Sequence, residues 1–273
     1  MLPSRPSRRL FPLQLPLLLL LPIGLWPRRS PARDAATLTV AAASDLRFAL
    51  DAVLGPFRAA HRDLRVDVVY GSSGKLATQI RQGAPFDLYF AADRAYAQAL
   101  HDAGLTAGPP RLYAIGRLVL WSADASLGRL GLADIVRHPA LKRLAIANPE
   151  HAPYGQRAVE ALRSQGLYNA VKDRLVLGDN VSQAAQFVQT GAAQAGIVAA
   201  SLVLSPALTG QGAWTLLPQA WHTPLEQAYV QMRRAEAQPL AAELLRHLGT
   251  PEMVALMRRY GFAVPAASDT GPP

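Results

Sequence analysis

Small and hydroxylated residues gather at four points where a short apolar run ends and an amphipathic segment begins. These points are residues 41–45, 70–75, 148–155 and 178–182. If each is a junction between a strand and a helix, it presents backbone N–H groups that have no acceptor within the helix. The positive end of the helix dipole lies at the same place, so such a junction suits a bound oxyanion.

The polar residues at these junctions also have a simpler interpretation as helix N-caps, which would account for Ser44, Asp45, Ser72 and Ser182. The segment 71–74, Gly-Ser-Ser-Gly, is more informative. Its two glycines allow close approach of a ligand to the backbone, while the hydroxyls of Ser72 and Ser73 supply donors. Capping and ligand binding both stay open for these two serines.

The same residues do not match the common catalytic motifs. A phosphate-binding P-loop requires four residues between its glycines and a hydroxyl after its lysine, whereas only two separate Gly71 from Gly74, and Leu76 follows Lys75. A Gly-x-Ser-x-Gly elbow is absent, and no motif places a histidine and an acid beside Ser73, as a hydrolase or transferase would need. The six histidines lack ligand spacing for a resident metal. We therefore expect a protein that is not an enzyme and has no cofactor.

Short apolar runs alternate with amphipathic segments from residue 37 onward, which predicts an α/β protein with largely parallel sheets. Strands are expected at residues 38–43, 64–70, 86–91, 118–121, 144–147, 175–177, 196–199 and 229–232. Helices are expected from Asp45, with a break or kink at Gly55-Pro56, and at 75–82, 182–189, 237–248 and 251–260. Ligands of open α/β sheets bind beyond the carboxyl ends of the strands, where the four junctions lie.

Residues 1–36 read as a cleaved signal peptide. A basic start is followed by an apolar run, 10–25, that contains three prolines and is too short for a membrane span. Residues 7–11, Ser-Arg-Arg-Leu-Phe, also resemble a twin-arginine signal, so the Sec and twin-arginine routes both stay open.

The formal net charge of +9 falls to +4 without residues 1–36, because this segment holds six arginines and one aspartate. No basic run with interleaved aromatics remains, so nucleic acid is not an expected partner. The absence of cysteine removes disulfides and a lipidated cysteine.

Several segments together resemble the molybdate-binding component of bacterial ABC importers. The matching residues are 40–44 (Val-Ala-Ala-Ala-Ser), 71–80, 83–87, 113–120, 146–155 (Ile-Ala-Asn-Pro-Glu-His-Ala-Pro-Tyr-Gly), 180–182, 196–198 and 259–262. The resemblance implies a type II periplasmic binding protein, α/β, with two lobes that each contain a mainly parallel sheet flanked by helices, and with two hinge crossings. Lobe 1 would be 37–115 plus 222–273, and lobe 2 would be 116–221.

The resemblance also implies the ligand and the residues that bind it. Molybdate, and tungstate with it, would be held in the interlobe cleft by the hydroxyl and N–H groups of Ser44 and Ser73 and by the backbone of Tyr154 and Val181, with Asp45 and Ser72 as further candidates. Molybdenum would be present only as this oxyanion. The implied partners are an ABC permease and its ATPase, and we expect a periplasmic monomer.

One departure from the family pattern concerns a tyrosine hydroxyl that many members place on the ligand after the Gly-Ile-Val strand. Here Ala199 and Ala200 follow residues 196–198, so that donor is missing. Other members lack it too and carry a tyrosine at the position of Tyr154. A pocket that offers only donors would reject hydrogen phosphate, whose proton needs an acceptor, and could exclude sulfate by size alone. A binding protein for sulfate, phosphate or ferric ion is the nearest alternative, and an effector domain of a transcription regulator is a more distant one.

Overall fold

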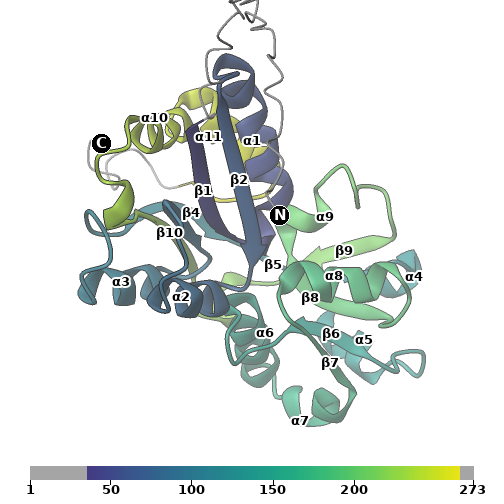
Figure 1. Ribbon diagram of the computed structural model, residues 1–273. Coiled ribbons are helices and arrows are strands. Elements are labelled where there is room, and N and C mark those ends of the chain that lie inside the picture. The colour runs from purple at the N-terminus through teal and green to yellow at the C-terminus, as the bar shows by residue number, and fades with distance from the viewer. Residues whose placement is uncertain (1–35, 265–273) are drawn as a thin grey trace, which may run out of the picture. The chain divides into compact units, whose positions relative to one another are not determined.

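The computed structural model describes residues 36–264 as an α/β protein built on two five-stranded sheets (Figure 1). These residues belong to one compact unit. The predicted signal peptide, apart from Ala36, lies outside the described residues. Within residues 36–264, no helix is long and apolar enough to cross a membrane.

The first sheet has the strand order β2-β1-β3-β10-β4. Its strands are β1 (Ala36–Ala43), β2 (Leu64–Gly71), β3 (Leu88–Ala91), β4 (Arg111–Gly116) and β10 (Leu225–Gln231). β1 runs parallel to β2 and β3, whereas β10 is antiparallel to both β3 and β4. The parallel strands β1 and β2 therefore end at the same edge, where Ala43 pairs with Gly71.

The second sheet has the order β7-β6-β8-β5-β9. Its strands are β5 (Leu118–Ser122), β6 (Leu144–Ala147), β7 (Leu175–Gly178), β8 (Ala195–Ala199) and β9 (Ala213–Leu216). β6 is parallel to β7 and β8, and β5 is antiparallel to β8 and β9. The chain passes between the sheets twice, from β4 to β5 and from β9 to β10. The predicted lobe boundaries at residues 115/116 and 221/222 stay predictions, because sheet membership alone does not define a folding unit.

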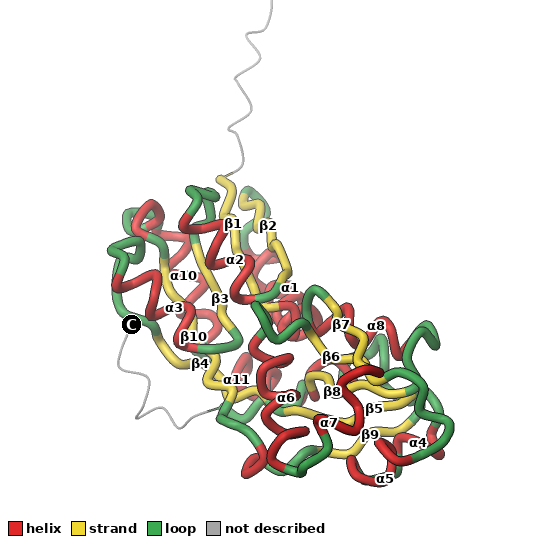
Figure 2. The backbone as a smooth tube through the Cα atoms, turned by 90° about the horizontal axis from the view of Figure 1, so that it is seen from below, coloured by secondary structure: helices red, strands yellow, loops and turns green. Residues whose placement is uncertain are grey.

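Helices cover both faces of the first sheet (Figures 1 and 2). Leu50 of α1 (Arg47–Ala60), Leu244 of α10 (Pro239–Leu248) and Met257 of α11 (Pro251–Arg259) share one apolar core with β1. On the other face, α2 (Ser73–Arg81) and α3 (Arg94–Asp102) pack through residues that include Leu76 and Leu100. The alternation of outward and inward side chains along β1 explains why one strand serves both cores.

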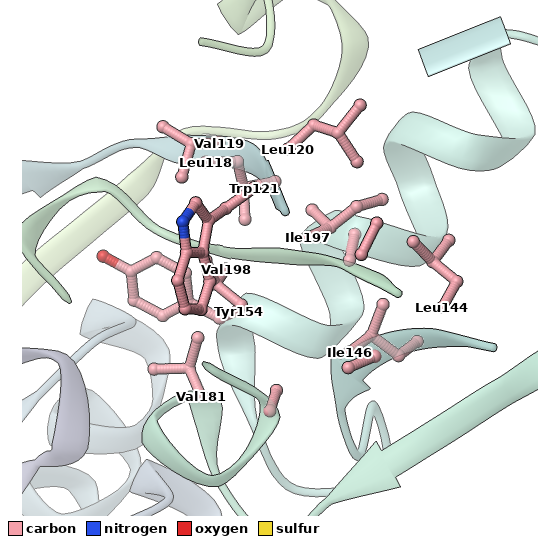
Figure 3. Close-up of a cluster of buried hydrophobic side chains, with 14 of the residues drawn as sticks. Leu118, Val119, Leu120, Trp121, Leu144, Ile146, Tyr154, Val181, Ile197 and Val198 are labelled. Atoms are coloured by element: carbon pink, nitrogen blue, oxygen red, sulfur yellow. The ribbon is translucent and has the colours of Figure 1, made fainter. Parts of the chain in front are cut away.

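The core of the second sheet is a separate cluster around β5, β6 and β8 (Figure 3). Trp121 and Ile146 are fully buried there, and α6 (Pro153–Ser164) and α8 (Val181–Gln189) cover the sheet. The shorter helices are α4 (Ala125–Gly128), α5 (Leu132–Arg137), α7 (Tyr168–Val171) and α9 (Ala200–Val203), with 3-10 turns η1 (Ser44–Leu46), η2 (Lys172–Arg174), η3 (Gln219–Trp221) and η4 (Arg233–Ala235).

The structure differs from the sequence predictions in three elements. The first helix does not end at Gly55-Pro56, because α1 continues to Ala60 with Pro56 inside it, so the predicted break is wrong and the predicted alternative, a kink, stays a prediction. β4 and β9 were not predicted as strands. Residues 111–116 carry mixed burial, and the β9 residues are half-buried or exposed, so neither segment shows the continuous apolar run of a central parallel strand. The predicted glycines after α2 and α8 do adopt the left-handed conformation, with φ of 91° at Gly83 and 77° at Gly191.

Candidate functional site

Two helix starts from each sheet form the candidate site. In the first sheet, η1 begins with Ser44 directly after β1, and α2 begins with Ser73 two residues after β2. In the second sheet, α6 begins with Pro153 after β6, and α8 begins with Val181 after β7. All four strands point their carboxyl ends toward these starts, as expected for a ligand site of an open α/β sheet.

The predicted ligand-binding residues are nearly inaccessible to solvent. The exposed fraction is 4% for Ser44, 0% for Ser73, 2% for Tyr154 and 3% for Val181, and the additional candidates Asp45 and Ser72 are at 1% and 4%. Burial of so many polar groups at helix starts requires that each find a partner or be held ready for a ligand. Their hydrogen bonds show which of these applies.

The two serine hydroxyls are bonded in the same way. Ser73 Oγ accepts a hydrogen bond of 2.9 Å from the backbone N–H of Ala92, which follows β3. Ser44 Oγ accepts a longer one, 3.4 Å, from the backbone N–H of Ser182 in α8. A hydroxyl that accepts a bond in this way keeps its own hydrogen for donation. Neither serine donates that hydrogen to an acceptor within residues 36–264.

Three backbone amides at the helix starts have no acceptor. Ser73 and Val181 are the first residues of their helices and Tyr154 is the second, so their N–H groups lack an intrahelical partner. Other bonds do not satisfy them within the described part of the chain. Some neighbouring amides are satisfied by the protein itself: Gln183 N–H donates to the side chain of the N-cap residue of its helix, Asn180. The unsatisfied donors thus include three of the amides predicted to bind the oxyanion.

Asp45 lies at the centre of a buried polar cluster that connects elements of both sheets. Its Oδ2 accepts from the hydroxyl of Tyr154 at 3.0 Å and from Nε2 of Gln227, in β10, at 2.5 Å. Gln227 Nε2 also reaches the Tyr154 hydroxyl at 3.2 Å, and its Oε1 accepts from the Tyr113 hydroxyl at 2.7 Å. Oδ1 of Asp45 is buried and has no partner among the described residues.

Burial raises the pKa of Asp45 to about 6, against the opposing effect of the hydrogen bonds from Gln227 and Tyr154. The burial effect dominates because desolvation penalises the charged carboxylate. No Lys, Arg or His within residues 36–264 forms an ion pair or hydrogen bond with Asp45. The carboxyl group is therefore a buried acid without a compensating cation.

The side chain of Tyr154 is directed to this cluster. Figure 3 shows its hydroxyl pointing away from Ile146 and Leu144, at the border of the apolar core. Gly116, the last residue of β4, borders the same hydroxyl, and a Cβ at this position would collide with it. The tyrosine expected after residues 196–198 is absent, because Ala199 and Ala200 follow them, and the next residue, Ser201, donates its hydroxyl to the backbone oxygen of Asp45 at 2.8 Å. The Tyr154 hydroxyl is thus engaged by Asp45.

Ser72 has a partner in the second half of the molecule and does not cap α2. Its Oγ lies 2.8 Å from Nδ1 of His151, and the N–H of Gly74 donates to the backbone oxygen of His151 at 2.9 Å. Burial, followed by the charge of Lys75, lowers the pKa of His151. The pair Ser72 and His151 brings a hydroxyl next to an imidazole, but Ser73, the serine considered as a nucleophile, contacts Ala92 and Tyr89.

An exposed ion pair lies near the contact between Ser72 and His151. Nζ of Lys75 lies 2.9 Å from Oδ1 of Asp179, with exposed side-chain fractions of 47% and 67%. Lys75 is thus engaged at the surface and contributes no charge to the buried donors.

A cavity of about 360 Å³ borders one end of the site. Its lining includes Ser44 and the residues on either side of Val181, and Arg47 and Tyr70 bound it from α1 and β2. Ser73, Tyr154 and Val181 do not line it. Of the four residues predicted to bind the ligand, Ser44 is therefore the one that lines this cavity.

Sequence reasoning missed Gln227, Tyr113, Ala92 and the contact of His151 with Ser72. Gln227 and Tyr113 lie on strands with no junction motif, and Ala92 contributes only its backbone N–H. Spacing along the chain carries no signal for such partners. Gln227 does not stand out in its segment, because the neighbouring Glu226 is polar as well.

Comparison with known proteins assigns the family. The profile of the bacterial extracellular solute-binding proteins matches residues 38–263. The molybdate-binding protein ModA of Rhodobacter capsulatus is 36% identical over 198 residues, which cover 72% of this chain and 77% of that protein. ModA of Azotobacter vinelandii is 35% identical over 85% of this chain and 92% of its own length.

A solved structure agrees with these sequence matches. The periplasmic molybdate-binding protein of Azotobacter vinelandii superimposes with a TM-score of 0.79 at 29% identity, covering 84% of this chain and 100% of that one. Two sheets of five strands with flanking helices match the predicted periplasmic binding protein fold. The chain therefore belongs to the family of bacterial extracellular solute-binding proteins, within which it is similar to molybdate-binding proteins.

Proposed function

We propose that the protein captures molybdate, and tungstate with it, in the periplasm and delivers it to an ABC permease with its ATPase. The anion would bind between the two lobes, residues 37–115 with 222–273 and residues 116–221. This proposal assigns to the chain the ligand for which its relatives are named. The protein would act as a monomer, without a cofactor and without enzymatic activity.

The observation that carries the proposal is the set of unsatisfied donors at four helix starts. Two hydroxyl hydrogens, from Ser44 and Ser73, and the N–H groups of Ser73, Tyr154 and Val181 are buried without acceptors. Each buried donor left unpaired costs about 1 to 3 kcal/mol, so an arrangement of this kind is explained by a ligand that pairs them. A tetrahedral dianion has the acceptor oxygens to do so.

The charge of the anion would be balanced by dipoles and not by a cation. The helix starts supply partial positive charge, and neither Lys75 nor Arg47 reaches the buried donors, since Lys75 pairs with Asp179 and Arg47 lies over the ring of Tyr70, 5.4 Å from its centroid. The number of neutral donors and the directions of their hydrogen bonds hold the oxyanion, so the site favours anions of one size and one protonation state over others.

The main alternative is a binding protein for sulfate or phosphate. Hydrogen phosphate needs an acceptor for its proton, and the hydroxyl and N–H donors at the helix starts offer none. Sulfate carries no such proton, and contacts set for a larger anion would be stretched around it. The distinction between molybdate and tungstate, which have nearly the same size, is not expected to be large.

Isothermal titration calorimetry of the purified protein with molybdate, tungstate, sulfate and phosphate tests the proposal. We expect one-to-one binding of molybdate and tungstate and no measurable heat from sulfate or phosphate. Binding of sulfate or phosphate alone, or of none of the four anions, would contradict the proposed ligand.

Size-exclusion chromatography with light scattering, before and after addition of molybdate, tests whether the protein is a monomer. Cleavage of the signal peptide is tested by the mass of the protein recovered from the periplasm.

A further inference from the structure

Among the described residues, two buried carboxyl groups have an oxygen without a hydrogen-bond partner, those of Asp45 and Asp87. Of these only Asp45 lacks an ion pair, since Oδ1 of Asp87 lies 3.3 Å from Nη1 of Arg234. Asp45 is 1% exposed, and its Oδ1 has no hydrogen-bond partner. Its Oδ2 accepts hydrogen bonds from Tyr154, on a helix that covers the second sheet, and from Gln227, on a strand of the first sheet. A buried carboxylate without a cation is expensive, and a lone unpaired oxygen adds to this cost. Such a group is more easily understood if it is neutral in one functional state.

The neighbours of Asp45 offer no positive charge from any packed element. Tyr154 on α6 and Tyr113 on β4 face it, and burial raises the pKa of both phenols well above 10, so both are neutral. From α9, Ser201 donates its hydroxyl to the backbone oxygen of Asp45, and from α8, Ser182 donates to the backbone oxygen of the preceding residue, Ser44.

The remaining titratable neighbours lie on β2 and α1. Tyr70 of β2 donates its hydroxyl to Asp51 of α1, which is exposed, and burial raises the pKa of Tyr70 as well. Arg47 of α1 is exposed and lies over the ring of Tyr70. The charge of Asp45 is thus not compensated from any side.

Asp45 is also adjacent in sequence to Ser44, whose hydroxyl is one of the proposed oxyanion donors. A dianion at the four helix starts would be a second negative charge in the same buried region. Two like charges at close range cannot both stay ionised there without a large penalty, and the carboxyl is the group that can lose its charge. Protonation would also convert Asp45 from an acceptor into a donor.

Building on the proposed function, we propose that the protein captures a proton together with the oxyanion: the Asp45 carboxylate becomes a neutral carboxylic acid when molybdate binds. The proton comes from the solvent and forms the O–H bond of the acid, and no other bond is made or broken. Asp45 is accordingly a positioning residue whose carboxyl group does not contact the anion. Its charge state and its hydrogen bonds to Tyr154 and Gln227 differ between the free and the anion-bound protein.

Proton uptake can be measured directly by calorimetry. Molybdate is titrated into the wild-type protein at about pH 7 in two buffers of different ionisation enthalpy, neither of them an oxyanion buffer. The difference in heat gives the number of protons taken up per anion bound. We expect between about half a proton and one proton, because Asp45 is mostly ionised in the free protein at this pH and mostly neutral in the complex. The dissociation constant should rise with pH by up to about tenfold per unit between about pH 6.5 and 8.

The variant Asp45→Asn should bind molybdate without proton uptake and with an affinity that does not change over the same pH range. The matched control is Asp51→Asn, which removes an exposed carboxylate of α1 and should leave proton uptake as in the wild type. The wild-type measurement does not depend on the folding of either variant.

The outcomes separate this inference from the proposed function. Molybdate binding with less than about a tenth of a proton taken up, and with no pH dependence, overturns the role of Asp45 and leaves the proposed function intact. Proton uptake that persists in Asp45→Asn also overturns it. If molybdate does not bind to the wild-type protein, the proposed function fails and this inference fails with it.

Discussion

The hydroxyl of Tyr154 lies 3.0 Å from Oδ2 of Asp45, so a residue of α6 in the second sheet is hydrogen-bonded to the first turn after β1 in the first. The backbone N–H of the same tyrosine is one of the free donors at the start of α6. One residue thus combines a contact between the two halves of the molecule with a proposed contact to the anion. The two functions can be separated by mutation, because only the first uses the side chain.

Replacement Tyr154→Phe removes the hydroxyl and keeps the backbone donor. We expect molybdate to bind severalfold more weakly, with the loss in a faster dissociation rate, since a neutral hydrogen bond contributes about 0.5 to 1.5 kcal/mol. Stopped-flow measurement of binding and release checks this. A loss of a hundredfold or more would show that the hydroxyl contacts the anion itself.

Replacement Gly116→Ala should destabilise the protein, because the new Cβ would collide with the Tyr154 hydroxyl and lie 2.8 Å from Nε2 of Gln227. We expect a loss of about 1 to 3 kcal/mol in the free energy of unfolding, measured by urea denaturation. The double variant Gly116→Ala with Tyr154→Phe should recover part of this loss, since the nearest atom is gone. Equal and additive effects of the two changes would argue against the collision.

Removal of either serine hydroxyl should weaken binding without changing the fold. For Ser44→Ala and Ser73→Ala we expect a loss of about 1.5 to 3 kcal/mol each, or roughly tenfold to more than a hundredfold in Kd, as for a hydrogen bond to a charged group. Calorimetric titration with molybdate measures it. The control Ser126→Ala removes an exposed hydroxyl of α4 and should bind as the wild type does. Unchanged affinity in both site variants would remove these hydroxyls from the site.

The backbone donor of Val181 can be tested because proline is tolerated at the first position of a helix. The preceding residue, Asn180, is already extended, with φ of −156° and ψ of 173°, as a residue before proline prefers. Val181→Pro should therefore keep α8 but weaken molybdate binding by at least about tenfold, whereas Val181→Ala, which keeps the N–H, should weaken it far less. Similar losses in both would point to packing and not to the amide.

The free energy of unfolding of the anion-free protein should depend on pH because of Asp45. Its pKa rises from 3.8 to about 6 on folding, so the native state binds the proton more tightly than the unfolded chain does. The free energy of unfolding should fall as pH rises from about 4 to about 6, by about 3 kcal/mol, and level off above. Comparison of urea denaturation for the wild type and Asp45→Asn isolates this change, which the variant should lack. Parallel pH profiles would rule out a raised pKa.

The strand-to-helix junctions could be predicted from sequence because they depend on local chemistry. Serine, glycine and proline after apolar runs indicate where strands end, and the helices beginning at Ser73 and Val181 start within two residues of the predicted positions. The continuation of α1 through Gly55-Pro56 has a local reason as well, since packing of Leu54 and Phe57 against the core outweighs the hydrogen bond lost at Pro56.

The polar cluster around Asp45 could not be predicted, because its members come from four distant segments. Gln227 is 182 residues from Asp45 and 73 from Tyr154, and nothing near Gln227 in the sequence indicates a site. The roles of Ser72 and Lys75 likewise depend on His151 and Asp179 across the fold. Local sequence identifies which groups are available, whereas tertiary structure decides which of them remain free for a ligand.

The outer strands of the two sheets have a consequence for behaviour at high concentration. β2 is an edge strand whose outer face includes Val69 at 47% exposed, and β7, also at an edge, exposes Leu177 to the same degree. Open edges with apolar side chains invite pairing between copies. β2 counters this with the charged pair Arg65 and Asp67, 2.8 Å apart, but β7, Leu175–Gly178, carries no charged residue. β9 (Ala213–Leu216), the other edge of the second sheet, also carries no charged residue and exposes Trp214 and Leu216 at 42% each. Self-association should therefore begin at the edges of the second sheet, and a lysine in place of Leu177 should delay pairing through β7.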